Sequence, residues 1–130
     1  MFEFNKDDKR RCEIMGISNT HGYRLGGIFH FGNLTLEQLD KLLEEKFIDP
    51  KEAQNNSPTV DDFRFYMKRF PGATAHGYIV SPERDDYRVS IEGIECEGNF
   101  DVETQIDFYK TFRFADELIY NDNYMYCWFD

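Results

Sequence analysis

The end of the chain limits the possible folds most, because two runs of strand-forming residues stand on either side of a turn. Residues 118–120 and 124–129 are aliphatic or aromatic almost throughout, and Asn121, Asp122 and Asn123 separate them. Two such runs around a short polar segment predict a β-hairpin. Because hairpin strands pair antiparallel, the sheet that contains this hairpin is expected to be mainly antiparallel.

A first hairpin is expected near the start of the chain. Residues 10–18 and 23–31 form its two predicted strands, and the polar residues 18–22 form its turn. Gly26 and Gly27 interrupt the second strand, which predicts a bulge or a close approach of another backbone.

The middle of the chain predicts another pair of strands. Residues 75–81 and 86–97 have strand-like composition, and residues 82–85 join them. Tyr87, Val89 and Ile91 share one face of the second strand. Ile94 and Cys96 continue that face only if Gly93 forms a bulge.

Two helices separate these hairpins. Thr35 and Gln38 form a capping box ahead of apolar residues at helical spacing, which predicts a helix over residues 36–47. Thr59 predicts the start of a second helix, which Pro71 and Gly72 end.

Residues 100–114 give two conflicting signals. Most of the even positions are apolar, as in a strand, but fifteen residues are too many for a typical strand and the alternation would bury Lys110. A helix with Asp101 at its N-cap avoids both problems, so we predict a helix. Its apolar arc is formed by Val102, Ile106, Phe108, Tyr109 and Phe112.

These elements follow one another as ββ-α-α-ββ-α-ββ. Strands that arrive in hairpins predict a single α+β domain over residues 1–130, in which about three helices pack on a mainly antiparallel sheet. The 130 residues are 41% hydrophobic and 17% aromatic, which is enough for one sizeable core. The longest apolar run, residues 124–129, is far shorter than the ~20 residues of a membrane-spanning helix.

The charge is strongly acidic and unevenly distributed. The chain carries 25 Asp and Glu against 15 Lys and Arg, a net charge of −10. Residues 71–130 contain thirteen of the acids and only four of the bases. Direct binding of nucleic acid is therefore disfavoured, since phosphates need clustered Lys and Arg. The acidic half either keeps the protein soluble or attracts a basic protein surface.

The cysteines and histidines show no spacing typical of a catalytic or metal site. Cys12, Cys96 and Cys127 are odd in number and all fall on predicted strands, so we expect buried, reduced thiols in a cytoplasmic protein. His21, His30 and His76 lack metal-ligand spacing and are expected at the surface or hydrogen-bonded in the core. No cofactor motif is found, and we expect no cofactor, no metal site and no catalytic residue.

Two groups of residues are candidates for an interface. Strand alternation places Tyr124, Tyr126 and Trp128 on one face and Met125, Cys127 and Phe129 on the other. The first three are binding candidates if their face is exposed, because Tyr and Trp are common at binding hot spots; the alternative is a strand buried on both sides. The acidic candidates are Glu92, Glu95, Glu97, Glu103 and Asp107. A carboxylate metal site is disfavoured there, because no basic track for a nucleic-acid substrate accompanies it.

The C-terminal tail resembles the endings of small uncharacterised bacterial proteins, some of them carried on phages or mobile elements. The resemblance lies in Ala115-Asp116-Glu117 followed by residues 126–130, Tyr-Cys-Trp-Phe-Asp. It implies a bacterial cytoplasmic origin and supplies no catalytic residue.

Three functions remain open from the sequence. The first is a non-catalytic module that binds another protein or itself. The second is an acidic inhibitor that imitates nucleic acid and occupies a DNA-binding enzyme. The third is an enzyme for small substrates that uses a histidine and a carboxylate. No membrane partner is expected.

Overall fold

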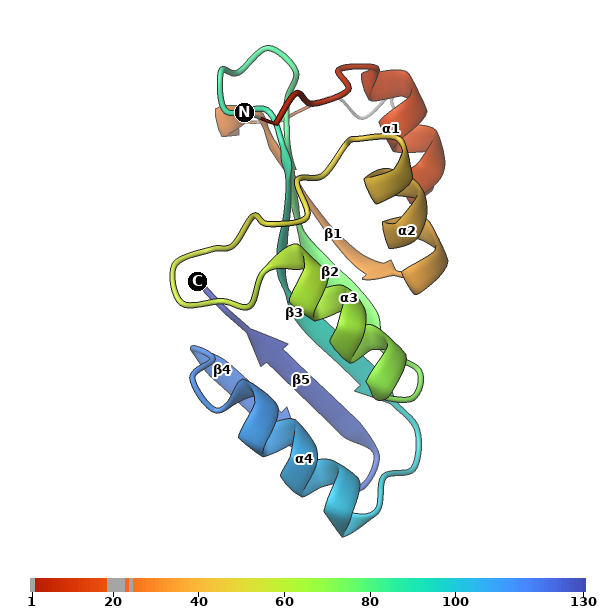
Figure 1. The fold of residues 1–130 in the computed structure, drawn as a ribbon, viewed down its shortest axis with the longest axis vertical. Helices are drawn as coiled ribbons and strands as arrows, with labels where there is room; N and C mark the ends of the chain where they lie inside the picture. Colours follow the sequence, from red (N-terminus) through yellow and green to blue (C-terminus); the bar gives the residue numbers. More distant parts are fainter. Residues whose placement is uncertain (1, 19–22, 24) are drawn as a thin grey trace.

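In the computed structural model, which describes residues 2–18, 23 and 25–130, five strands form one antiparallel sheet (Figure 1). The strand order is β1-β2-β3-β5-β4, and every neighbouring pair is antiparallel. This confirms the expected α+β class. The strands are β1 (Ile28–Leu34), β2 (Thr74–Val80), β3 (Val89–Glu97), β4 (Glu117–Tyr120) and β5 (Tyr124–Trp128).

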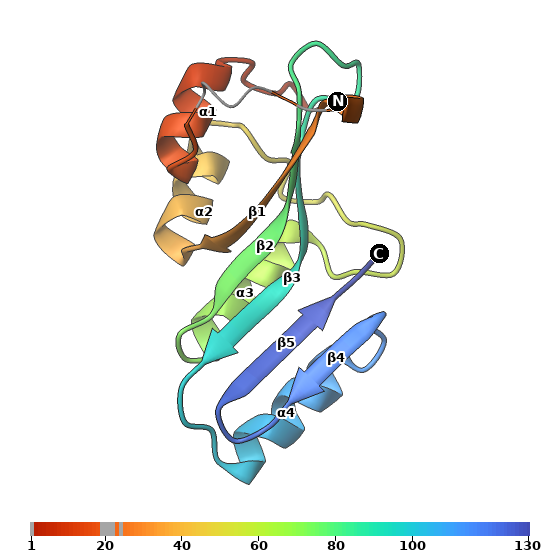
Figure 2. The same ribbon diagram turned by 180° about the vertical axis from the view of Figure 1, so that it is seen from behind.

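The α-helices of the described chain lie on one side of this sheet. The helices α3 and α4 lie in front of the strands in Figure 1 and behind them in Figure 2, which is the view from the opposite side. The contacts of α3 with β3, and of α4 with β4 and β5, are consistent with this placement. The helix α2 packs beside α3, and α1 beside α2. The helices are α1 (Asp8–Met15), the short 3₁₀ helix η2 (Leu25–Gly27), α2 (Leu36–Glu44), α3 (Val60–Arg69) and α4 (Val102–Phe112).

The hydrophobic core fills the space between the sheet and these helices. Phe63 of α3 and Phe112 of α4 are fully buried and stacked, with ring centroids 6.4 Å apart. Met125 and Cys127 of β5 are also fully buried in this core. One face of the sheet is therefore the floor of the core.

The prediction of a first strand at residues 10–18 is wrong. Residues 8–15 form helix α1, whose N-cap Asp7 accepts a hydrogen bond from the Arg10 amide and whose C-cap Gly16 has a left-handed φ of 69°. Its buried positions are Arg11, Cys12 and Met15, so a charged side chain stands on the buried face and obscures the helical pattern. The predicted first hairpin does not exist, and most of its expected turn lies outside the described residues.

The second predicted strand begins later than expected. Gly26 and Gly27 belong to η2, both with positive φ, and β1 starts at Ile28. A Cβ on Gly27 would lie 3.0 Å from Cδ of Arg84, so a side chain approaches this glycine, and not another backbone as expected. The described chain thus has four α-helices instead of about three, in the order α-β-α-α-β-β-α-β-β.

The other elements are confirmed. The predicted capping box forms at Thr35 and Gln38, and α2 ends at Glu44 rather than residue 47. Thr59 caps α3 as predicted, and it also forms a capping box with Asp62. His76 pairs with Gly93 while Gly77 pairs with Ile91, so the predicted bulge is present and returns Ile94 to the core.

Residues 102–112 are the helix α4, as predicted, with Asp101 as N-cap. Only part of its expected apolar arc reaches the core. Phe108 and Phe112 are fully buried, whereas Val102, Ile106 and Tyr109 are exposed. No helix of the described residues is both long and apolar enough to cross a membrane.

Candidate functional site

The face of the sheet that the helices leave uncovered is the candidate site (Figure 2). On β5, Met125 and Cys127 point into the core, so the alternation of a strand turns Tyr124, Tyr126 and Trp128 to the opposite face. These three side chains are half-buried and not enclosed. The alternative of a strand buried on both sides is therefore wrong. We call this surface the open face.

A row of stacked rings crosses the open face from β2 to β5. The His76 imidazole lies parallel to the Tyr126 ring, with centroids 4.9 Å apart, and Tyr126 stacks on Tyr124 at 6.3 Å. The His76 Nε2 donates a hydrogen bond of 2.9 Å to the Cys127 carbonyl. Burial lowers the pKa of His76, which favours the neutral ring. The row is thus held in place by stacking and by a backbone hydrogen bond.

Glutamates are hydrogen-bonded to the aromatic side chains of this face. The Trp128 indole donates to Glu92 at 3.2 Å, and the Tyr124 hydroxyl donates to Glu95 at 2.6 Å. Burial and the Glu95 carboxylate raise the pKa of Tyr124. Glu97 lies opposite Tyr124 in the register of β3 and β5. The open face therefore alternates ring surfaces with carboxylates.

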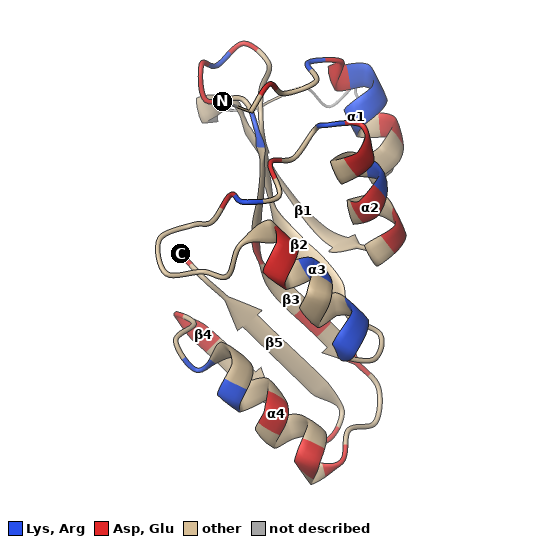
Figure 3. Cartoon of the chain, viewed as in Figure 1, with Lys and Arg blue, Asp and Glu red and all other residues tan. Residues whose placement is uncertain are grey.

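The strands contain no positive charge of their own. None of the five strands includes Lys or Arg, whereas four glutamates occur in them, namely Glu92, Glu95, Glu97 and Glu117. Figure 3 shows the Lys and Arg residues on helices and loops. The Arg88 guanidinium from the loop before β3 lies over the Tyr78 ring of β2, 5.4 Å from its centroid. A cation can therefore sit on a ring of this face.

The structure brings six of the eight predicted interface residues together and separates the other two. Tyr124, Tyr126, Trp128, Glu92, Glu95 and Glu97 belong to the adjacent strands β3 and β5. Glu103 and Asp107 lie instead on α4, which packs on the covered side. Asp107 forms an ion pair with Arg69 of α3.

The cysteines are buried, as expected, although Cys12 lies on a helix and not on a strand. Burial raises the pKa of Cys96 and of Cys127 to about 12, so both thiols stay protonated at neutral pH. His30 is exposed on β1, and His21 lies outside the described residues. Within the described part of the chain, no three His, Cys, Asp or Glu residues are grouped to hold a metal ion.

A second polar region was missed by the sequence analysis. Glu52 forms an ion pair with Arg88, at 3.2 Å, and the Arg88 guanidinium donates to the Tyr78 hydroxyl at 2.7 Å. Gln54 accepts a hydrogen bond from the same hydroxyl. These residues come from two loops and one strand, and no motif in the sequence links them. Only the path of residues 50–58 around the sheet brings them together.

The fold and the site define a small α+β protein with a single antiparallel sheet, one covered face and one open aromatic and acidic face. Comparison with family models, with curated proteins and with solved structures found no match. The function is therefore inferred from the geometry of the described residues.

Proposed function

We propose that this chain is a protein-binding module whose open face binds a Lys- or Arg-bearing segment of a partner protein. The observation that carries the proposal is the combination of stacked rings and carboxylates on strands that contain no basic residue. Ring faces attract cations, and carboxylates beside them add a charge-assisted hydrogen bond.

An internal contact of the open face supports this proposal. Arg88 lies over Tyr78 at one end and reaches the carboxylates of Asp86 and Glu52. Among the described residues, the cation–π contacts include none with Tyr124, Tyr126 or Trp128. These rings, with Glu92 and Glu95 hydrogen-bonded to them, offer the same chemistry to a cation from outside.

Trp128 provides a direct test, because it is the chain's single Trp and lies on the open face. We expect its fluorescence to change saturably when a Trp-free octalysine peptide is added, and not when octaglutamate is added. The double variant Glu95→Gln, Glu97→Gln should weaken octalysine binding about three- to thirtyfold, since each exposed ion pair contributes about 0.3–1 kcal/mol.

The matched control is Glu37→Gln with Glu44→Gln, which removes the same charge from exposed positions on α2. It should change the affinity by less than about twofold. If both double variants weaken binding equally, the peptide responds only to net charge and the proposal fails. It also fails if octalysine leaves Trp128 fluorescence unchanged.

Affinity capture at two salt concentrations separates this proposal from the acidic inhibitor of a DNA-binding enzyme. A partner that contacts the rings should remain bound at moderate salt, because apolar and ring contacts are screened little. A DNA-binding enzyme that is retained only at low salt would instead support imitation of nucleic acid. Mass spectrometry identifies which of these is retained by the wild-type chain and released by the Glu95→Gln, Glu97→Gln variant.

A further inference from the structure

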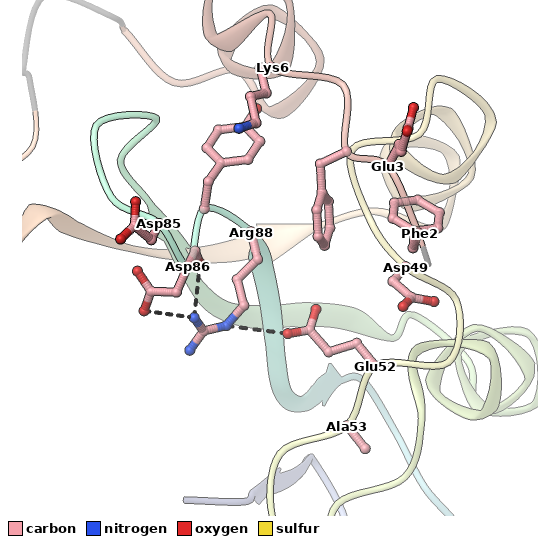
Figure 4. Close-up of a pocket in the computed structure, with 11 residues that line it drawn as sticks. Phe2, Glu3, Lys6, Asp49, Glu52, Ala53, Asp85, Asp86 and Arg88 are labelled. Carbon is pink, nitrogen blue, oxygen red and sulfur yellow. Dashed lines mark hydrogen bonds and ion pairs between the residues drawn. The ribbon is translucent and has the colours of Figure 1, made fainter.

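A groove at the N-terminal end of the molecule has the features of a separate small-molecule site (Figure 4). Its volume is about 700 Å³, and its walls come from residues 2–6, residues 49–53 and residues 85–88. Three segments distant in the sequence thus meet around one hollow. None of the eight predicted interface residues lines it.

One wall of the groove is aromatic. The rings of Phe2 and Phe4 meet edge to face with centroids 4.8 Å apart, and Phe4 meets Tyr87 in the same way at 6.2 Å. The Tyr87 hydroxyl donates to the Asn5 carbonyl at 2.8 Å, which fastens the N-terminal segment to the rest of the fold. This wall suits an apolar chain or ring of a ligand.

The opposite wall holds a carboxylate with a free oxygen. Oε1 of Glu52 pairs with Nε of Arg88, whereas Oε2 is buried and has no hydrogen-bond partner. Arg88 does not supply that partner, since Nη1 donates to Asp86 and Nη2 donates to the Tyr78 hydroxyl. A buried acceptor without a donor is costly, so Oε2 marks a place for a donor from outside the chain.

The charges around Glu52 favour a cation at that place. Arg88 and Asp49 are the charged groups that act on Glu52. Glu3, Lys6, Asp85 and Asp86 also line the groove. Five acids and two bases therefore line the groove. Burial, with a smaller contribution from Asp49, raises the pKa of Glu52 to about 7 even though Arg88 opposes the shift.

Two more buried polar atoms lie along the same chain of contacts. Nε2 of Gln54 and Oγ of Ser90 have no hydrogen-bond partner in the structure. Gln54 contacts Tyr78, and Ser90 lies opposite Tyr78 in the register of β2 and β3. Ser90 is almost completely buried, with 1% of its surface exposed. Of these three unsatisfied residues only Glu52 lines the groove, and the other two reach it through Tyr78 and Arg88. Because unsatisfied polar groups are rare in folded proteins, the Glu52 oxygen in the groove wall points to a polar ligand group.

We propose that this groove binds a small primary amine, whose ammonium group donates to Oε2 of Glu52 and whose apolar part lies against Phe4 and Tyr87. An ammonium fits better than a guanidinium, because a planar guanidinium prefers both oxygens of a carboxylate and Glu52 has only one free. A bare divalent cation would leave the aromatic wall unused.

The test uses hexylammonium as the probe and nuclear magnetic resonance of the full chain as the readout. We expect saturable shifts of the backbone amides at Asp49, Glu52 and Arg88, with a Kd on the order of 1 mM for so small a ligand. Hexanoate and hexanol should give no saturable shifts at these amides, and hexylguanidinium should bind more weakly than hexylammonium.

Glu52→Gln keeps the size of the side chain and removes its charge, and we expect it to weaken hexylammonium binding at least about tenfold. Glu83→Gln is the matched control, since Glu83 is exposed near the groove but does not line it. Folding of both variants is checked from their spectra. The proposal is overturned if hexylammonium gives no saturable shifts, if hexanoate binds as well, or if both variants weaken binding equally.

The proposal for this groove and the proposal for the open face can be tested separately. The Glu95→Gln, Glu97→Gln variant should bind hexylammonium as the wild type does, because neither residue lines the groove. Conversely, Glu52→Gln should leave octalysine binding at Trp128 within about twofold of the wild type. Loss of both activities in both variants would show a general effect of net charge.

Discussion

Arg11 shows how one side chain holds the N-terminal helix on the sheet. It is completely buried, and its guanidinium donates to Asp8 at 2.8 Å, to the Tyr23 hydroxyl at 2.6 Å and to the Val80 carbonyl at 2.9 Å. The guanidinium also lies over the Tyr87 ring, 4.2 Å from its centroid. A buried charge is tolerated only with such partners, and here they join α1 to β2 and to the loop before β3.

Glu52 predicts a specific dependence of stability on pH. Burial raises its pKa from an ordinary value of 4.5 to about 7 in the folded chain. Between these pH values the folded chain binds more protons at Glu52 than the unfolded chain does, so the stability linked to this group is lost as the pH rises through that range. The Glu52→Gln variant does not titrate there.

We therefore expect the free energy of unfolding of Glu52→Gln, relative to the wild type, to increase between pH 4.5 and pH 8. Urea unfolding at several pH values measures this difference, and Glu83→Gln controls for the loss of one charge at an exposed position. If the difference in free energy of unfolding between the two chains stays constant or falls as the pH rises, the pKa of Glu52 is not raised in the folded chain.

For the helices and strands, local sequence signals predict most elements correctly. The prediction fails where a side chain is buried by a tertiary contact that the local pattern does not indicate. Capping residues and breakers predicted α2, α3 and α4, and the turn at residues 121–123 predicted β4 and β5. Residues 10–18 were expected as a strand but are mostly helix, because the buried face of α1 carries Arg11. No hydrophobic pattern identifies a buried face whose central member is charged.

The bulge in β3 makes Gly93 a sensitive position. A Cβ at Gly93 would lie 1.9 Å from the Cys127 carbonyl oxygen of β5, a distance that real contacts do not reach. The backbones would have to separate where β3 passes β5. We expect Gly93→Ala to lower the free energy of unfolding by about 1–3 kcal/mol, as overpacking does elsewhere.

Gly32→Ala serves as the comparison for this variant. A Cβ at Gly32 meets nothing within 4 Å, so the change should stay within about 0.5 kcal/mol of the wild type. Chemical denaturation of both variants gives the comparison. Equal stability of the two would mean that β3 and β5 can separate without cost.

For the molecule as a whole, the decisive fact is that the helices cover only one face of the sheet. Neighbouring residues of β5 therefore face different surroundings, since Met125 is fully buried while Tyr126 is half-buried on the open face. A single strand thus serves both the core and the candidate interface.

The two faces predict opposite results for neighbouring substitutions. Met125→Ala should lower the free energy of unfolding by about 2–5 kcal/mol, because it opens a cavity in the core. Tyr126→Ala should cost less than about 1.5 kcal/mol, since it removes a ring from a partly solvated stack. Thermal and urea unfolding of the two variants measure these losses of stability.

Tyr126→Ala should also weaken octalysine binding, measured by Trp128 fluorescence, while the fold remains intact. A Tyr126→Ala variant that unfolds as readily as Met125→Ala would show that the open face is structural. Unchanged octalysine binding in a folded variant would remove Tyr126 from the proposed interface.

Local sequence signals are enough to predict the α+β class, the antiparallel pairing, three of the helices and the alternation of β5, because each depends on caps, turns and periodicity within a short window. The tertiary structure decided which face of β5 the helices cover, where Glu103 and Asp107 lie, and that residues 2–6, 49–53 and 85–88 enclose a groove. These outcomes depend on contacts between distant segments. The placement of Arg11 and the free oxygen of Glu52 follow from packing across the whole chain, which no local pattern encodes.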